Sequence, residues 1–259
     1  LLGFLSAGDH VITSSMEHNS VLRPLTFLEK NGVEVSIVPA DTTGQVSPES
    51  MMQAVRDTTR LIAITHASNV TGTLHDIGTL GQYCRTRHIR LLVDAAQTAG
   101  TVPIDVEQMQ IDFLAFSGHK GLLGPQGTGG LFIRDEAALR PLMRGGTGSL
   151  SDLEEQPEFL PDRYESGTLN VLGLAGLGAG CEFLLKTGVE KIMEHDRHLL
   201  DIFLGELSGH SRVQVYGGDD RQKHTGVLSL NIHEMSPSTV GERLEQDQGI
   251  LTRIGLHCA

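Results

Sequence analysis

Residues 89–97 read Ile-Arg-Leu-Leu-Val-Asp-Ala-Ala-Gln, a mostly apolar run that ends in a carboxylate and an amide. The run at residues 61–64, Leu-Ile-Ala-Ile, is apolar without interruption. Strands of a parallel sheet show this pattern when helices cover both faces of the sheet. The sequence therefore predicts an α/β fold with a central, mostly parallel sheet flanked by helices.

Short β-rich runs alternate with amphipathic segments through the first half of the chain, which is typical of crossover units in α/β proteins. We predict strands at residues 10–14, 33–39, 61–65, 89–94, 112–117 and 130–133. Crossover helices are predicted at residues 20–31, 48–57 and 76–88. These elements build the large domain.

The residue composition changes from about residue 173, where small residues become frequent. We predict helices at residues 173–185, 189–207 and 237–246, and strands at residues 213–216, 227–232 and 250–254. The elements after residue 186 form a smaller α+β unit. We place the domain boundary near Lys186, which gives a large domain of residues 1–185 and a small domain of residues 186–259.

The charge and composition of the chain exclude several classes of function. The chain has 20 basic and 32 acidic side chains and a net charge of −12, the wrong sign for binding phosphate backbones. Its 3 cysteines are too few for a disulfide framework, and its 12 histidines are scattered, so we expect no metal site. No run approaches the roughly 20 apolar residues of a membrane span. We expect a soluble cytoplasmic protein that binds neither nucleic acid nor membrane.

Polar residues follow four of the predicted strands, and ligands of open parallel sheets gather at that edge. Taken singly, each residue has another interpretation, because an Asp after a strand is often a helix cap and most lysines are solvated on the surface. Their joint occurrence predicts one site. The four groups are Glu17-His18-Asn19, His66-Ala67-Ser68-Asn69, Asp94-Ala95-Ala96-Gln97 and Ser117-Gly118-His119-Lys120.

The residue types in these groups fit an aldehyde cofactor, pyridoxal 5'-phosphate. Lys120 follows an apolar strand in a glycine-rich setting and is a candidate Schiff-base lysine. Asp94 is a candidate partner for the pyridinium nitrogen, which it would keep protonated so that the ring acts as an electron sink. The remaining candidates are His18 for stacking on the ring, Asn69 and Gln97 for the phenolic oxygen, and Ser117 and His119 for the phosphate.

These residues resemble the fold-type I, class V aminotransferase-like enzymes and, within them, the cysteine desulfurases and selenocysteine lyases. The resemblance runs over nearly the whole chain. It is carried by the stretches at residues 16–19, 68–72, 93–97, 117–120, 164–168 and 253–259. It implies that Lys120, Asp94 and His18 have the roles given above and that Thr168 contacts the phosphate from the other subunit of a homodimer.

Cys258 is the candidate sulfur-carrying residue. A near-terminal cysteine is often a small buried apolar residue, but Arg253 and His257 precede Cys258 and can stabilise a thiolate. Residues 253–259 match the Arg-x-Gly-x-His-Cys-Ala motif of the group II desulfurases. The resemblance implies that L-cysteine becomes L-alanine, that Cys258 takes the sulfur as a persulfide, and that a sulfur-acceptor protein receives it. Asn69 and Arg253 are the expected substrate-binding residues, and Lys120, Cys258 and His18 the expected catalytic residues.

We expect the chain to lack both ends of the full-length enzyme, namely an upstream phosphate loop and a downstream arginine for the substrate carboxylate. Activity is therefore expected of the full-length protein. Two alternatives stay open at this point. One is a selenocysteine lyase or another class V reaction with L-selenocysteine or a different substrate, and the other is a catalytically silent scaffold on the same fold.

Overall fold

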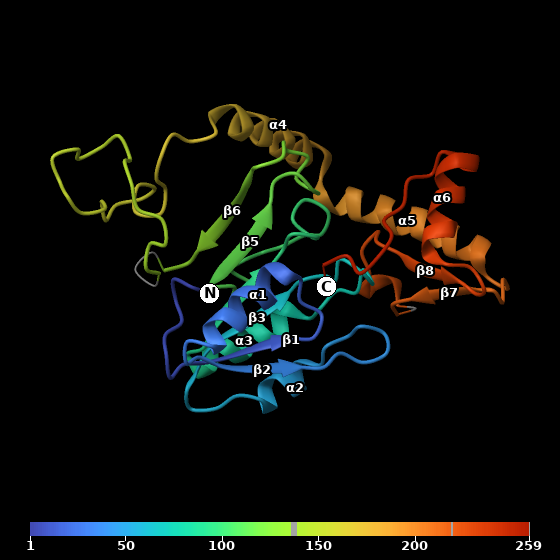
Figure 1. The fold of residues 1–259 in the computed structure, drawn as a ribbon, viewed down its shortest axis with the longest axis horizontal. Coiled ribbons are helices and arrows are strands. Elements are labelled where there is room, and N and C mark those ends of the chain that lie inside the picture. Colours follow the sequence, from blue (N-terminus) through green and yellow to red (C-terminus); the bar gives the residue numbers. More distant parts are fainter. Residues whose placement is uncertain (136–138, 219, 259) are drawn as a thin grey trace.

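The structure is a computed structural model that describes all residues except 136–138, 219 and 259. Six strands form one sheet in the order β2-β1-β3-β4-β5-β6 (Figure 1). Neighbouring strands are parallel from β2 to β5, and β6 is antiparallel to β5. The strands are β1 His10–Ser14, β2 Glu34–Val38, β3 Thr59–Thr65, β4 Arg90–Asp94, β5 Phe113–Ser117 and β6 Gly129–Ile133. The predicted α/β fold with a mostly parallel sheet is confirmed.

Helices cover both faces of the sheet. Alternate residues of each strand point to opposite faces, so the apolar side chains of one strand pack against helices on both sides. Ile62 and Ile64 of β3 belong to a buried cluster with α2 (Pro48–Gln53) and α3 (Ile77–Arg87). Leu61 and Ala63 belong to a second cluster with α1 (Asn19–Glu29). Two apolar faces on one strand explain the uninterrupted apolar run in the sequence.

Helix α2 is shorter than predicted, because the chain turns after residue 53 and enters β3. The backbone N–H of Arg56 donates to the hydroxyl of Thr59 at 2.8 Å, and the Arg56 guanidinium pairs with Glu34 on β2 at 2.6 Å. These contacts direct residues 54–58 toward the sheet. The predicted helix over residues 48–57 is therefore wrong in its last four residues.

The second half of the chain contains a two-stranded antiparallel sheet. The elements of this half are α4 Val171–Thr187, α5 Val189–Leu207, β7 Val213–Tyr216, the short 3-10 helix η2 Arg221–Lys223, β8 Ser229–Ile232 and α6 Pro237–Gln248. Helices α5 and α6 lie beside the small sheet, whereas α4 lies alongside β5 and β6 (Figure 1). Gly188, with φ of 91°, separates α4 from α5. Our domain boundary at Lys186 falls within the last turn of α4 and stays a prediction.

Among the described residues, no single helix has both the length and the apolar character needed to cross a membrane. Helices α4 and α5 meet that requirement only when taken as a pair, and they are bent by 81° at their junction.

The predicted strand over residues 250–254 is wrong. Within the described residues the segment has no strand partner, since β7 and β8 pair only with each other. The side chain of Leu251 is 80% exposed and that of Ile254 is 48% exposed. An apolar, β-branched sequence favours a strand only where a neighbouring backbone supplies the ladder hydrogen bonds.

The loop between β3 and α3 forms hydrogen bonds with the chain around the small sheet. The N–H of Leu74 donates to the carbonyl of Lys223 at 2.9 Å, and the N–H of Thr225 donates to the carbonyl of Gly72 at 2.9 Å. The hydroxyl of Ser229 donates to the carbonyl of Val70 at 2.5 Å. The residues that follow β3 are therefore fixed by the chain of the small sheet.

Candidate active site

The carboxyl ends of four strands lie at one edge of the six-stranded sheet. Strands β1, β3, β4 and β5 are parallel and adjacent in that order. Their last residues are Ser14, Thr65, Asp94 and Ser117. The polar groups that follow these strands are thus brought together at the same edge, as expected for the ligand site of an open parallel sheet.

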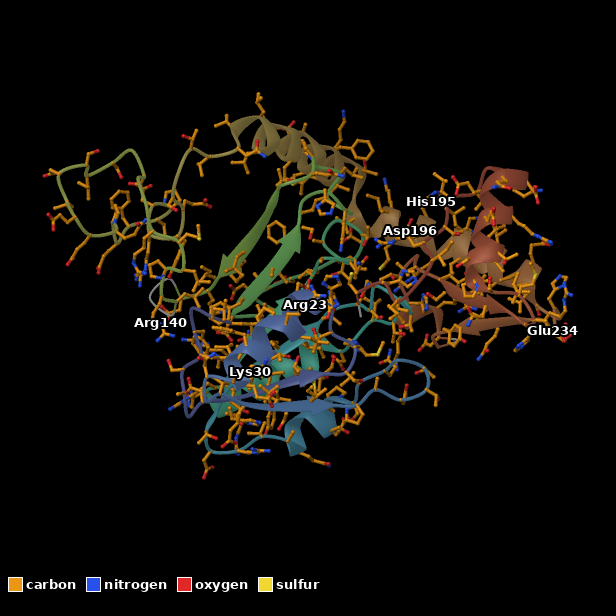
Figure 2. All side chains as sticks on the ribbon, viewed as in Figure 1. Arg23, Lys30, Arg140, His195, Asp196 and Glu234 are labelled. Atoms are coloured by element: carbon orange, nitrogen blue, oxygen red, sulfur yellow. The ribbon has the colours of Figure 1, made fainter. Side chains whose placement is uncertain are left out.

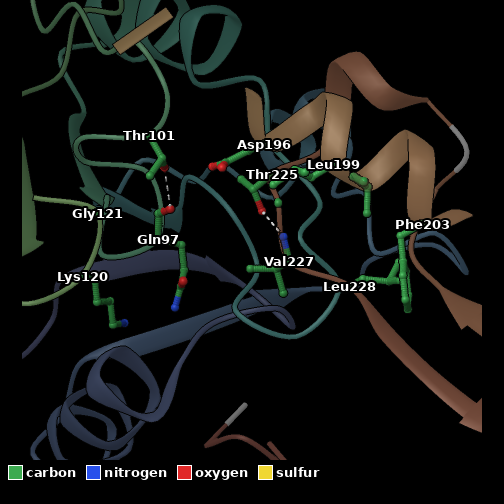
Figure 3. Close-up of a pocket in the computed structure, with 12 residues that line it drawn as sticks. Gln97, Thr101, Lys120, Gly121, Asp196, Leu199, Phe203, Thr225, Val227 and Leu228 are labelled. Carbon is green, nitrogen blue, oxygen red and sulfur yellow. Dashed lines mark hydrogen bonds between the residues drawn. The ribbon is translucent and has the colours of Figure 1, made fainter. Parts of the chain in front are cut away.

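Lys120 lies in a tight turn after β5 and is half-buried. Its side-chain amine makes no hydrogen bond or ion pair with any residue that the structure describes. The turn packs closely on the turn after β4, where a Cβ at Gly121 would lie 2.6 Å from the carbonyl oxygen of Ala99. Only glycine allows this approach, and the result is that the side chains of Lys120 and Gln97 reach into the same space (Figure 3).

A cavity of about 470 Å³ begins at Lys120 and Gln97 and extends toward α5. Asp196, labelled on α5 in Figure 2, lines its far side together with Leu199 and Phe203. The volume is within the range of small-molecule sites. His18, Asn69 and Asp94 are not among the residues that line it.

His18 and Asp94 both make local hydrogen bonds with the backbone. The Nδ1 atom of His18 accepts from the N–H of Ser20 at 3.0 Å, so the half-buried imidazole caps α1. The Oδ1 atom of Asp94 accepts from the N–H of Ala96 at 2.9 Å. These bonds leave one ring nitrogen of His18 and the second carboxylate oxygen of Asp94 without a partner among the described residues.

The loop that carries Cys258 is held by residues from the same sheet edge. The side-chain amide of Asn69 donates to the carbonyl of His257 at 2.8 Å. The backbone N–H of Asn19 donates to the carbonyl of Cys258 at 2.8 Å. His257 and Cys258 have φ of 55° and 61°, in the left-handed region that is uncommon for residues other than glycine. Cys258 is exposed.

Two of the expected site residues are exposed and lie in irregular segments of the chain. Thr168 is exposed and belongs to the long irregular segment before α4, which extends away from β7 and β8 (Figure 1). Arg253 is exposed in the irregular segment after α6. Ser117 is half-buried at the end of β5, and His119 is exposed. Ala259, the last residue of the quoted motif, lies outside the described residues.

Three buried titratable groups near the strand ends were not assigned a role from the sequence. Burial raises the pKa of Glu17 to about 7, although hydrogen bonds from Ser14 and Thr65 act in the opposite direction. Burial lowers the pKa of His66 and of His75 to about 4. The sequence signal for Glu17 was its place beside His18, directly after an apolar strand.

Comparison with known proteins assigns the chain to a family. The family profile described as aminotransferase class-V matches residues 1–259. A probable cysteine desulfurase of Methanothermobacter thermautotrophicus is 39% identical over 257 residues, which cover 97% of this chain and 64% of that protein. A probable cysteine desulfurase of Pyrococcus abyssi is 34% identical over 261 residues, which cover 97% of this chain and 63% of that protein.

Solved structures of proteins named cysteine desulfurases are also similar to this chain. The apo cysteine desulfurase of Thermococcus onnurineus superimposes with a TM-score of 0.91 at 34% identity, covering 100% of this chain and 66% of that one. The cysteine desulfurase CsdA of Escherichia coli gives a TM-score of 0.87 at 28% identity, covering 98% and 63%. The chain spans less than two thirds of the length of these relatives. It belongs to the aminotransferase class-V family.

Proposed function

We propose that the full-length protein is a pyridoxal-phosphate-dependent cysteine desulfurase that moves the sulfur of L-cysteine to Cys258. The observation that carries this proposal is the attachment of the cysteine loop to the sheet edge. Asn69 and Asn19 hold the carbonyls of His257 and Cys258 at the edge where Asp94 also lies. The similarity to proteins named cysteine desulfurases supports the same assignment.

The residues at the sheet edge fit the cofactor by their chemistry. Lys120, after β5, offers a half-buried amine without a partner among the described residues. At the same sheet edge, Asp94 of β4 has a carboxylate oxygen and His18 after β1 has a ring nitrogen without such a partner. We assign Lys120 to the aldehyde carbon, Asp94 to the ring nitrogen and His18 to the ring face. Asn69 and Gln97 are assigned to the ring oxygen. Ser117, His119 and the other subunit's copy of Thr168 are assigned to the phosphate.

The bound cofactor supplies an electron sink for the carbon skeleton of the substrate. Asp94 keeps the ring nitrogen protonated, and the amine of Lys120 moves the α-proton of cysteine. The thiolate of Cys258 attacks the substrate sulfur, so that an S–S bond forms and the C–S bond breaks. The electron pair of the broken bond stays with the substrate carbon, which takes up a proton.

The reaction balances without an external oxidant. L-Cysteine and the Cys258 thiol give L-alanine and a Cys258 persulfide. The exposed position of Cys258 suits transfer of this sulfur to an acceptor protein. Arg253 is proposed to contribute to substrate binding, and the division into a large and a small domain near Lys186 is proposed for the full-length chain.

The cofactor assignment is tested by absorbance spectroscopy of the full-length protein. Lys120→Ala should abolish the visible absorbance of the bound cofactor and its covalent retention after borohydride reduction. Lys30→Ala is the matched control, because Lys30 is an exposed lysine at the end of α1. A Lys120→Ala protein that retains the cofactor covalently would contradict the assignment.

A further inference from the structure

Glu17 is a fully buried carboxyl group at the centre of the sheet edge. Its side chain is 0% exposed. The Oε1 atom accepts from the hydroxyl of Ser14 at 2.7 Å and from the backbone N–H of Thr65 at 2.9 Å. The carboxyl group therefore joins the carboxyl ends of β1 and β3.

The second carboxyl oxygen of Glu17 is buried and has no hydrogen-bond partner among the described residues. No lysine or arginine of the described chain forms an ion pair with Glu17. An ionised carboxylate buried without a counterion is far less favourable than a neutral carboxyl group. The surroundings therefore favour the form of Glu17 that keeps its proton.

Three titratable groups stand next to the strand ends that Glu17 joins: His18 directly follows Glu17, His66 directly follows Thr65, and Asp94 ends the neighbouring strand β4. His18 is the N-cap of α1, and its Nδ1 atom is bonded to Ser20. His66 follows β3 and is bonded to the hydroxyl of Thr98 at 3.0 Å. Asp94 ends β4 directly opposite Thr65 in the parallel ladder. The charge of Asp94 raises the pKa of Glu17 in addition to burial, the largest cause.

We propose that Glu17 is a positioning residue of the cofactor site, which joins the ends of β1 and β3 through its hydrogen bonds and, by keeping its proton, adds no negative charge beside Asp94. This inference rests on the proposed assignment of Asp94 to the ring nitrogen of the cofactor. A second negative charge beside Asp94 would compete with it for the protonated ring nitrogen of the cofactor. Glu17 also precedes His18 directly, so that its bonds fix the turn from which the imidazole projects.

The proton on Glu17 has a definite effect on stability. Its pKa is about 7 in the folded chain against 4.5 for the unperturbed group. Between these two pH values the folded state binds a proton that the unfolded state has lost, so stability falls as the pH rises toward 7. The unfolding equilibrium constant should change by up to about tenfold per pH unit through this one group.

The experiment uses the full-length protein and three variants. Glu17→Gln keeps the shape and the accepting oxygen but cannot ionise. Ser14→Ala removes a hydrogen bond that lowers the pKa of Glu17, so ionisation should move to higher pH. Glu29→Gln is the matched control, since Glu29 is an exposed glutamate of α1.

The first measurement is urea unfolding of the cofactor-free proteins between pH 5 and pH 8. We expect the stability of Glu17→Gln relative to the parent to increase as the pH rises to about 7 and then to level off. Glu29→Gln should follow the parent at every pH. If Glu17→Gln also follows the parent, Glu17 does not hold the proton and the proposal is overturned.

The second measurement is the visible spectrum of the cofactor-loaded proteins over the same pH range. The parent should show a spectral transition near pH 7 that is absent in Glu17→Gln and moved to higher pH in Ser14→Ala. An unchanged transition in Glu17→Gln overturns the proposal, as does a folded Glu17→Gln protein that cannot hold the cofactor. If the parent itself binds no cofactor, the proposed function fails, and the unfolding measurement still decides the protonation of Glu17.

Discussion

The side-chain amide of Asn69 donates a hydrogen bond of 2.8 Å to the carbonyl of His257, 188 residues later in the chain. This bond and the one from the N–H of Asn19 to the carbonyl of Cys258 tie the cysteine loop to the sheet edge. The position of Cys258 therefore depends on Asn69. The same side chain is a proposed cofactor ligand, so under the proposed function one amide group would serve both loop attachment and cofactor binding.

Replacement of Asn69 by alanine should loosen the cysteine loop. Loss of one hydrogen bond worth about 1 kcal/mol should shift the equilibrium between the attached and the detached cysteine loop about fivefold toward the detached state. Hydrogen exchange of the Asn19 amide, which is bonded to Cys258, should become faster by that factor. Asn31→Ala is the control, because the amide of Asn31 donates to the carbonyl of Phe27 at the other end of α1. Equal exchange of the Asn19 amide in both variants would argue against the attachment.

Cys258 and Cys84 should differ strongly in their reactivity toward a thiol reagent at pH 7. Cys258 is exposed, whereas Cys84 is buried in the core and burial raises its pKa to about 12. Only the thiolate reacts. Iodoacetamide labelling followed by peptide mass spectrometry should therefore modify Cys258 first and leave Cys84 unmodified until the protein unfolds. Early modification of Cys84 would show that the core around α3 opens in the native state.

The buried histidines should make the protein sensitive to acid. Because burial lowers the pKa of His66 and His75 from 6.5 to about 4, the unfolded chain binds protons that the folded chain does not between these pH values. Stability should fall as the pH drops from 6.5 to about 4, by up to about 3 kcal/mol for each group.

His66→Gln tests this acid sensitivity by urea unfolding at several pH values. The slope between pH 6.5 and pH 4 should be smaller in His66→Gln than in the parent, while His210→Gln, which changes an exposed histidine, should leave the slope as it was. Glu17 acts in the opposite direction over part of this range, so the difference between variant and parent is the quantity to compare. An identical slope in both variants would contradict the prediction.

Gly72 should be intolerant of any side chain. Its φ is 73°, and a Cβ there would collide with the carbonyl of Val227 and lie 2.6 Å from Cε1 of His224. Gly8 has φ of 89° but no atom within 4 Å of such a Cβ. Gly72→Ala should therefore be at least about 1 kcal/mol more destabilising than Gly8→Ala, because it adds a steric conflict to the same backbone strain. Chemical denaturation of both variants measures this difference.

The sequence predicted the sheet and its polar edge well, because both depend on local patterns. Apolar runs marked β3 and β4, and the polar residues after each strand marked the edge. The strand predicted over residues 250–254 was wrong, because strand formation depends on a partner backbone that a single segment does not reveal. The antiparallel direction of β6 was equally invisible in its five residues.

The electrostatic character of the site was beyond sequence reasoning. Glu17 was noted only as part of a polar group after β1, because nothing in the sequence shows that its carboxyl group is fully buried. The bond from Asn69 to His257 joins residues that are distant in the chain and was not predicted. Both features arise from the way that loops pack at the sheet edge.

Intact-protein and peptide mass spectrometry of the full-length protein after incubation with L-cysteine for a single turnover test the proposed function most directly. We predict one added sulfur atom on the peptide that contains Cys258, one L-alanine for each persulfide, and loss of both in Cys258→Ala but not in Cys181→Ala. Formation of L-alanine at the parent rate by Cys258→Ala, or sulfur found on Cys181 in place of Cys258, would contradict the assignment of Cys258 as the sulfur-carrying residue.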